Sequence, residues 1–318
     1  MAKKSRAKIP PQTNKRNFLI GLSLVIVILA VVMTVFSLPK MNKDTKETIW
    51  AVDESHVLSF SHRELAAPHA TLIEDTANYS LEKISYQSYD TTVFGLLRVP
   101  KNVTKPAVII VLPAATVTKE TDSAMGNALS SWGYASLTLD ERGNGGETKG
   151  SSPMDFMAGF EAYSNGKMPA QYAQIYDVLL AYDYLQSRKD LDGGSISVLG
   201  ESMGGRFAII AAGIEPGFKA AFIVSSSPYG LDAGNNTDAI RFVDSVEPVT
   251  YLKKMPPRKL VMFHFTDDPI IPIPFGRSLY DNASQPKVWY QYNGSVHGVY
   301  SDIYASDLHT ELMRVFGR

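Results

Sequence analysis

The chain of 318 residues contains no cysteine, which excludes disulfide bonds, a cysteine nucleophile and thiolate metal sites. Its formal net charge is only −1, so the balance of charges does not indicate a basic surface for nucleic acids. None of its 6 histidines is spaced as in the H-E-x-x-H or H-x-x-x-H patterns of metal-binding helices. We find no internal repeat. We therefore expect no metal, no cofactor and no nucleic-acid partner.

A serine flanked by glycines follows the apolar run Ile196-Ser197-Val198-Leu199, in the pentapeptide Gly200-Glu201-Ser202-Met203-Gly204. The residues that come next, 206–212, are typical of a helix. A strand, a sharp turn and a helix with a serine at the turn indicate a nucleophile elbow, in which the hydroxyl is exposed above a sheet. An ordinary strand-to-helix turn is the alternative interpretation of Ser202.

An acid and a histidine follow this serine in an order that completes a catalytic triad. Two aspartates, Asp267 and Asp268, end one strand-like run, and His297 follows the next. Serine is a weak nucleophile until a base takes its proton, and an imidazole titrates near neutrality. A carboxylate can then orient the imidazole and stabilise its charged form. We predict a triad of Ser202, His297 and Asp268, with Asp267 as the other candidate acid.

Other motifs surround the triad, among them Asp140-Glu141-Arg142-Gly143-Asn144-Gly145. Together these features make residues 80–318 resemble an α/β-hydrolase of the dienelactone hydrolase and prolyl oligopeptidase type. The resemblance implies an α/β fold with a mostly parallel sheet flanked by helices. It also favours Asp268 over Asp267, because the family's acid stands shortly before a hydrophobic residue and a proline. Asp267 is then a surface or turn-capping carboxylate.

The resemblance places the oxyanion loop at Leu112-Pro113-Ala114-Ala115, where many members of the family carry His-Gly. The loop has to aim a backbone N–H at the developing oxyanion, which an alanine can still do. We expect the N–H of Met203 to be the first donor. The second donor is expected at Ala115, with Ala114 as the alternative.

Three charged side chains near these motifs are open to two interpretations each. Glu201 either tunes the neighbouring nucleophile or is a partly buried polar neighbour. Arg142 and Arg206 either bind a substrate carboxylate or form structural ion pairs.

The N-terminus predicts where the chemistry takes place. Residues 1–16 hold six bases and no acid, and residues 17–38 are almost wholly apolar. A run of about twenty apolar residues can cross a bilayer, and the apolar core of a cleaved signal is shorter. We predict a cytoplasmic tail at 1–16 and a transmembrane signal anchor at 17–38, with a cleaved signal as the alternative. A basic flank stays cytoplasmic, so the rest of the chain is expected outside the cell membrane.

The remainder of the chain is interpreted in two parts. Residues 39–80 show no clear period and are interpreted as a stalk or an N-terminal extension. Over 81–318, strand-like and helix-like segments alternate, which predicts one α/β-hydrolase catalytic domain. Residues 143–168 and 225–258 interrupt the alternation. We expect these two segments to form walls of the substrate pocket, a small cap, or surface excursions only.

These features predict a membrane-anchored serine hydrolase that cleaves a carboxylic ester through an acyl-enzyme. Amide hydrolysis needs dedicated peptide subsites, for which the sequence shows no feature, so a serine peptidase of the prolyl oligopeptidase type is the alternative. A non-catalytic binding protein with the same fold is a second alternative, and the complete triad argues against it. The expected partners are a small ester or short peptide substrate, and the membrane through residues 17–38.

Overall fold

The computed structural model describes residues 48–317. The strands are β1 (Trp50–Val52), β2 (Leu58–Phe60), β3 (Ala66–Asp75), β4 (Tyr79–Gln87), β5 (Thr92–Pro100), β6 (Val108–Leu112), β7 (Ala135–Leu139), β8 (Ile196–Glu201), β9 (Ala220–Val224), β10 (Lys259–Phe265) and β11 (Lys287–Tyr292). The helices are α2 (Ser123–Ser131), α3 (Phe156–Ser164), α4 (Ala170–Ser187), α5 (Met203–Ile214), α6 (Thr237–Val246), α7 (Val249–Leu252), α8 (Ile273–Asn282) and α9 (Asp302–Phe316).

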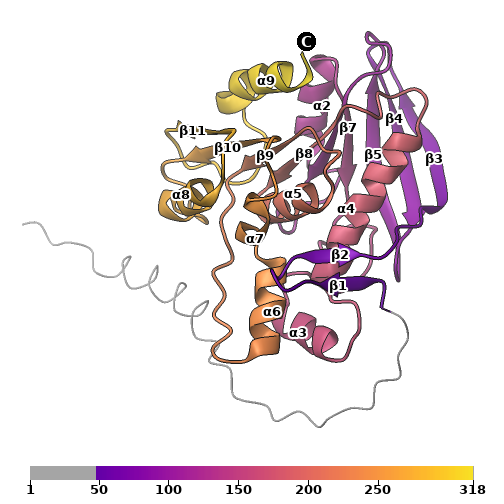
Figure 1. Cartoon of the computed structure of the whole chain (residues 1–318). Coiled ribbons are helices and arrows are strands. Elements are labelled where there is room, and N and C mark those ends of the chain that lie inside the picture. The colour runs from indigo at the N-terminus through magenta and orange to yellow at the C-terminus, as the bar shows by residue number, and fades with distance from the viewer. Residues whose placement is uncertain (1–47, 318) are drawn as a thin grey trace, which may run out of the picture. The chain divides into compact units, whose positions relative to one another are not determined.

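Nine of these strands form one sheet, in the order β11-β10-β9-β8-β6-β7-β5-β4-β3 (Figure 1). Strands β6 to β11 pair in parallel with one another, and β5, β4 and β3 extend the sheet with antiparallel pairs. Every residue of β6, Val-Ile-Ile-Val-Leu, is buried, as expected of a parallel strand covered on both faces. The predicted α/β class with a mostly parallel sheet flanked by helices is confirmed.

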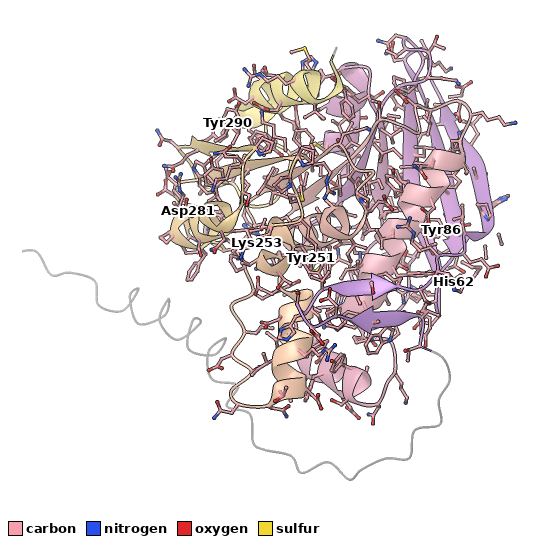
Figure 2. The ribbon with its side chains drawn as sticks, in the orientation of Figure 1. His62, Tyr86, Tyr251, Lys253, Asp281 and Tyr290 are labelled. Atoms are coloured by element: carbon pink, nitrogen blue, oxygen red, sulfur yellow. The ribbon has the colours of Figure 1, made fainter. Side chains whose placement is uncertain are left out.

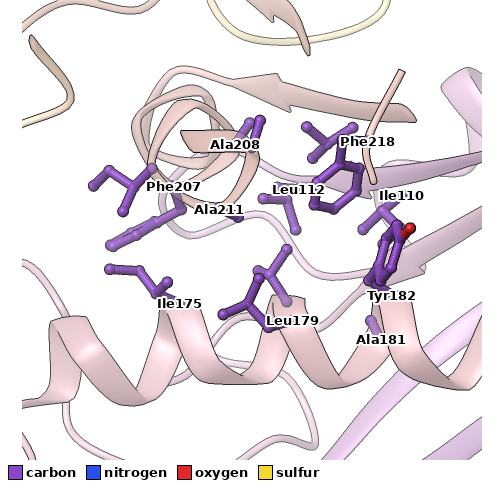
Figure 3. Close-up of a cluster of buried hydrophobic side chains, with 14 of the residues drawn as sticks. Ile110, Leu112, Ile175, Leu179, Ala181, Tyr182, Phe207, Ala208, Ala211 and Phe218 are labelled. Carbon is purple, nitrogen blue, oxygen red and sulfur yellow. The ribbon is translucent and has the colours of Figure 1, made fainter. Parts of the chain in front are cut away.

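Apolar layers on both faces hold the sheet in place. On one face, Leu112 of β6 packs in a cluster with Leu179 of α4 and Phe207 of α5 (Figure 3). On the other face, Ile109 and Val111 belong to a second cluster with residues of α2 and α9. Successive side chains of a strand point to opposite faces, so a single strand contributes to both layers. The strand ends that carry the site are therefore held from both sides.

The sheet begins before residue 81, where the catalytic domain was expected to start. Ala66–Asp75 forms the edge strand β3, which pairs with β4, and residue 81 falls inside β4. Further upstream, Trp50 of β1 packs against the rings of Tyr163 and Tyr172, at centroid distances of 5.4 and 5.1 Å. The sequence pattern missed β3 because this strand is almost wholly exposed and lacks the apolar alternation of a half-buried strand.

The two segments that interrupt the alternation pack together. Phe160 of α3 lies 6.0 Å from Phe242 of α6 between ring centroids, and Figure 1 shows both helices beside β1 and β2. Tyr251 of α7, labelled in Figure 2, joins these helices to the antiparallel hairpin of β1 and β2. Its hydroxyl accepts the Leu58 N–H at 3.0 Å and donates to the Ser245 carbonyl at 2.7 Å. Residues 143–168 and 225–258 therefore build one small helical unit, not two separate surface excursions.

Among residues 48–317, no helix is both long and apolar enough to span a membrane. The predicted tail at 1–16 and the predicted anchor at 17–38 lie outside the described residues.

Candidate active site

Ser202 occupies a strained turn between β8 and α5. Its φ is 50° and its ψ is −109°, a region that residues with a side chain rarely adopt. The turn is possible because glycines stand on either side. A Cβ atom on Gly200 would lie 2.3 Å from the Gly204 carbonyl oxygen, and one on Gly204 would lie 2.1 Å from that of Leu112. The two glycines of the motif are therefore required by close backbone approach.

Three elements bring the predicted triad together. His297 follows β11 and Asp268 follows β10, so both lie at the edge of the sheet where β8 delivers Ser202. The Nε2 atom of His297 lies 2.8 Å from the Ser202 Oγ atom. Its Nδ1 atom lies 2.8 and 2.9 Å from the two carboxylate oxygens of Asp268. A carboxylate can only accept, so Nδ1 carries the proton and Nε2 is left to accept the serine O–H.

Asp268 is held as a charged acceptor. Burial by itself raises the pKa of this carboxyl, but hydrogen bonds from His297 and from the N–H groups of Ile271 and Ile270 lower the pKa below its ordinary value. Both N–H groups donate to Oδ1 at 2.9 Å. Asp267, the other candidate acid, is exposed and accepts from the Thr266 hydroxyl. The geometry thus brings Asp268, and not Asp267, to the histidine.

His264 supports the loop that carries the acid. It is fully buried at the end of β10, and its Nε2 atom lies 2.7 Å from the Ile271 carbonyl oxygen. Its ring stacks on Trp289 at 5.5 Å between centroids, and burial lowers its pKa. A neutral imidazole with Nε2–H donating to Ile271 therefore fixes the turn next to Asp268. This contact was not foreseen from the sequence.

The expected oxyanion loop is held in place by a residue, Asn144, for which we predicted no role from the sequence. The side-chain amide of Asn144 donates to the carbonyl oxygens of Ala114 and Val117, at 3.0 and 2.7 Å, and accepts the Thr116 N–H. Ala114 is buried and Ala115 is exposed at the surface of this loop. Asn144 belongs to the motif that begins at Asp140, and its position in that motif is the sequence feature from which a role at the site could have been predicted.

The Met203 backbone begins α5 directly after the nucleophile. N–H groups in the first turn of a helix lack partners within the helix, which leaves them available to an anion. The elbow is tied to the neighbouring strand, because the Ser202 N–H donates to the Val224 carbonyl at 2.8 Å. The Ser226 hydroxyl donates to the Ser202 carbonyl, also at 2.8 Å.

Glu201 is fully buried, whereas the sequence suggested a partly buried neighbour. Neither of its carboxyl oxygens has a hydrogen-bond partner among residues 48–317. Burial first, and then the nearby Asp122, raises the pKa of Glu201 well above its ordinary value. Burial likewise raises the pKa of Asp122 to about 7. Two acidic side chains therefore lie in the apolar interior behind the nucleophile.

The two arginines singled out in the sequence differ in their partners. Arg142 is buried, with its Nε donating to Asp177 at 2.5 Å and one terminal nitrogen paired with Asp90. It is a structural ion pair. Arg206 instead donates to the carbonyl and hydroxyl oxygens of Ser227.

Comparisons with known proteins concern the family and the fold of the chain. The sequence model of the dienelactone hydrolase family matches residues 93–248. Among solved structures, an acetyl xylan esterase from Paenibacillus sp. R4 is similar with a TM-score of 0.65 at 20% identity, over 80% of this chain and 88% of that one. A glucuronoyl esterase from Solibacter usitatus gives 0.59 at 15% identity, over 81% and 87%. At such identities the likeness establishes the fold. A search among curated protein sequences found no match.

Proposed function

Since the chain is an α/β-hydrolase related to the dienelactone hydrolase family, we propose that it hydrolyses carboxylic esters through a triad of Ser202, His297 and Asp268. The observation that carries the proposal is the continuous path from Asp268 through His297 to Ser202, with each step between 2.8 and 2.9 Å. The strained elbow at Ser202 adds to it, because such strain persists where it serves a function.

In the acylation step, the Ser202 Oγ atom attacks the ester carbonyl while His297 Nε2 takes its proton. The imidazolium that forms lies against Asp268, whose carboxylate stabilises the positive charge. The N–H groups of Met203 and Ala115 hold the developing oxyanion. His297 then passes the proton to the leaving alcohol, and the acyl group stays on Ser202.

Deacylation repeats these steps with water as the nucleophile. His297 takes a proton from the water as it attacks the acyl carbonyl, and the same N–H groups hold the second oxyanion. Collapse of this intermediate returns the proton to Ser202 and releases the acid. The serine, histidine and aspartate are thus restored for another cycle.

Hydrolysis of a 4-nitrophenyl ester series from acetate to decanoate tests this proposal. We expect turnover by the full chain that is lost in Ser202→Ala, and the chain-length profile reports the size of the acyl pocket. Aminoacyl 4-nitroanilides are assayed in parallel. Faster serine-dependent turnover of these amides than of the esters would replace the esterase by a peptidase. The absence of serine-dependent turnover on both series would favour a binding protein.

We further propose that the hydrolase acts outside the cell, anchored by residues 17–38. The support is the sequence alone, a basic stretch at 1–16 followed by a long apolar run. The test is fractionation of cells that express the full chain or a variant without residues 1–38. We expect only the full chain to remain in membranes after an alkaline wash, with its C-terminal tag accessible to protease on intact cells. A soluble or protease-protected full chain would refute the anchor.

A further inference from the structure

Arg206 lies close to the nucleophile. It lies at the N-terminal end of α5, which begins directly after Ser202, and the side chains of a helix lean toward its N-terminus. The neighbouring loop fixes its position. Ser226 donates to the Ser202 carbonyl at 2.8 Å, and the next residue, Ser227, accepts from Arg206. The guanidinium is therefore bound to Ser227, whose neighbour Ser226 contacts the elbow directly.

The charge of Arg206 has no carboxylate partner within ion-pair distance among residues 48–317. Its hydrogen bonds go to the carbonyl and hydroxyl oxygens of Ser227, at 2.9 and 3.0 Å, and its guanidinium lies 4.4 Å from the centre of the Tyr229 ring. The Glu247 carboxylate accepts the N–H groups of Tyr229 and Gly230 and forms no ion pair with Arg206; burial raises the pKa of Glu247, and these N–H groups and the nearby charge of Arg206 lower it in part. Among residues 48–317, Arg206 thus places a positive charge that has no direct ion pair at the end of α5 that carries the nucleophile.

Tyr229 adds a second donor to the same place. Its hydroxyl is buried and finds no hydrogen-bond acceptor among residues 48–317. Burial raises the pKa of this phenol far above neutral, so the hydroxyl keeps its proton. Phe156 of α3 packs edge-on against the Tyr229 ring at 4.8 Å between centroids. A buried O–H that lacks an acceptor is unfavourable, even with the Arg206 guanidinium beside the oxygen, which indicates that another group accepts it.

We propose that Arg206 and Tyr229 form a subsite for a carboxylate carried by the ester substrate. A guanidinium and a phenol hydroxyl together offer donors to the two oxygens of a carboxylate, and the charge of Arg206 supplies the attraction. The N-terminal end of α5 adds favourable potential for an anion at this place. This inference rests on the proposed ester hydrolase activity and narrows its substrates to esters with a free acid group near the scissile bond.

The test compares esters that differ only in this charge. One pair is 4-nitrophenyl hydrogen succinate and its methyl ester, which places the carboxylate on the acyl side. The other pair is the butyryl ester of 4-hydroxybenzoate and its methyl ester, which places it on the leaving group. We expect the wild-type full chain to prefer one anionic ester about tenfold or more in kcat/KM over its neutral partner.

Substitutions then assign the preference to the subsite. Arg206→Gln is expected to remove it, while kcat/KM for the neutral ester stays within about twofold. Tyr229→Phe is expected to reduce the preference in part, and Arg206→Lys to keep some of it, because the charge remains but the fork of donors is lost. Arg314→Gln, an exposed arginine at the end of α9, is the matched control and is expected to behave like the wild type.

Two results would overturn the subsite while the proposed function stands. One is a wild-type enzyme that hydrolyses both members of each pair equally well. The other is an equal loss on charged and neutral esters in Arg206→Gln, which would make Arg206 a support of the elbow. If no ester of the four is hydrolysed in a Ser202-dependent way, the proposed ester hydrolase function itself fails, and the subsite fails with it.

Discussion

The two aspartates after β10 differ both in burial and in the hydrogen bonds that they accept. Asp268 is buried, is bound to His297 Nδ1 and accepts two backbone N–H groups, whereas Asp267 is exposed. A carboxylate that orients an imidazole has to be fixed in place and kept charged. Hydrogen bonds outweigh burial at Asp268 and keep its pKa low, so it stays charged through the neutral range.

We predict that Asp268→Asn lowers kcat by about 10³- to 10⁴-fold, because the amide favours the wrong imidazole tautomer. Asp267→Asn is the matched control one residue away and is expected to change kcat by less than about twofold. Steady-state hydrolysis of a 4-nitrophenyl ester measures both variants. Equal losses in the two variants would contradict the assignment of the acid.

A second prediction concerns the buried carboxyls behind the nucleophile. The folded-state pKa of Asp122 is raised to about 7, so the unfolded chain releases this proton first as the pH rises. The raised pKa of Asp122 therefore lowers the stability of the folded state progressively as the pH rises from about 4 to about 7. Asp122→Asn removes this cost and breaks no side-chain cap of α2, since the Asp122 side chain makes no cap hydrogen bond there. We expect its melting temperature to exceed that of the wild type by about 3 °C or more at pH 8, and by much less at pH 4.

Thermal melts of both proteins at pH 4 and pH 8 measure this difference. Asp192→Asn, a change at a partly exposed position, controls for the general effect of removing one acid. The same gain for Asp122→Asn at both pH values would contradict the proposed cause.

The turn between β8 and α5 is the element on which the site depends most. A Cβ on Gly204 would meet backbone, the Leu112 carbonyl oxygen, which cannot move aside without disturbing β6. We predict that Gly204→Ala costs about 3 kcal/mol or more of stability. Gly194→Ala is the control, because its Cβ would meet only the Asp192 side chain at 3.5 Å, an ordinary contact. Denaturant unfolding compares the two, and equal stabilities would be inconsistent with the close approach.

The oxyanion loop is the second element with a testable dependence. Asn144 fixes it with three hydrogen bonds, so Asn144→Ala should leave the loop in place only part of the time. We expect kcat to fall about 10- to 100-fold with a small change in KM, since the lost N–H contact acts on the oxyanion. Asn165→Ala, an exposed amide at the end of α3, serves as the control. A rise in KM at constant kcat would show that Asn144 serves substrate binding instead.

At the scale of the whole molecule, the sequence predicts those elements whose residues follow a strong local pattern, such as a continuous apolar run or a glycine-flanked turn. The buried runs of β6 to β10 and the glycines around Ser202 were recognisable because each is dictated by short-range geometry. The edge strand β3 was not, because a strand exposed on both faces carries no apolar alternation. His264 and Asn144 were also missed as supports, since their contacts join residues that only the fold brings together.

The extent of the domain leads to a prediction about truncation. A variant that begins at residue 48 retains every described contact of β1, β2 and β3, and we expect wild-type melting temperature and ester turnover. A variant that begins at residue 81 loses Trp50 from its aromatic neighbours and Arg63 from its ion pair with Glu215. We expect it to melt at a temperature lower by about 8 °C or more, or not to fold. Equal melting of the two variants would place the domain boundary at residue 81 after all.

The most direct test of the account is covalent labelling of the full chain by a fluorophosphonate, read by intact mass and peptide mapping. This reagent reacts with a serine only when a neighbouring base activates it. We predict one adduct, on Ser202, that forms in the wild type, is absent in Ser202→Ala and slows by orders of magnitude in His297→Ala. Labelling that is absent from the wild type, or that persists unchanged in Ser202→Ala, would contradict the proposed nucleophile.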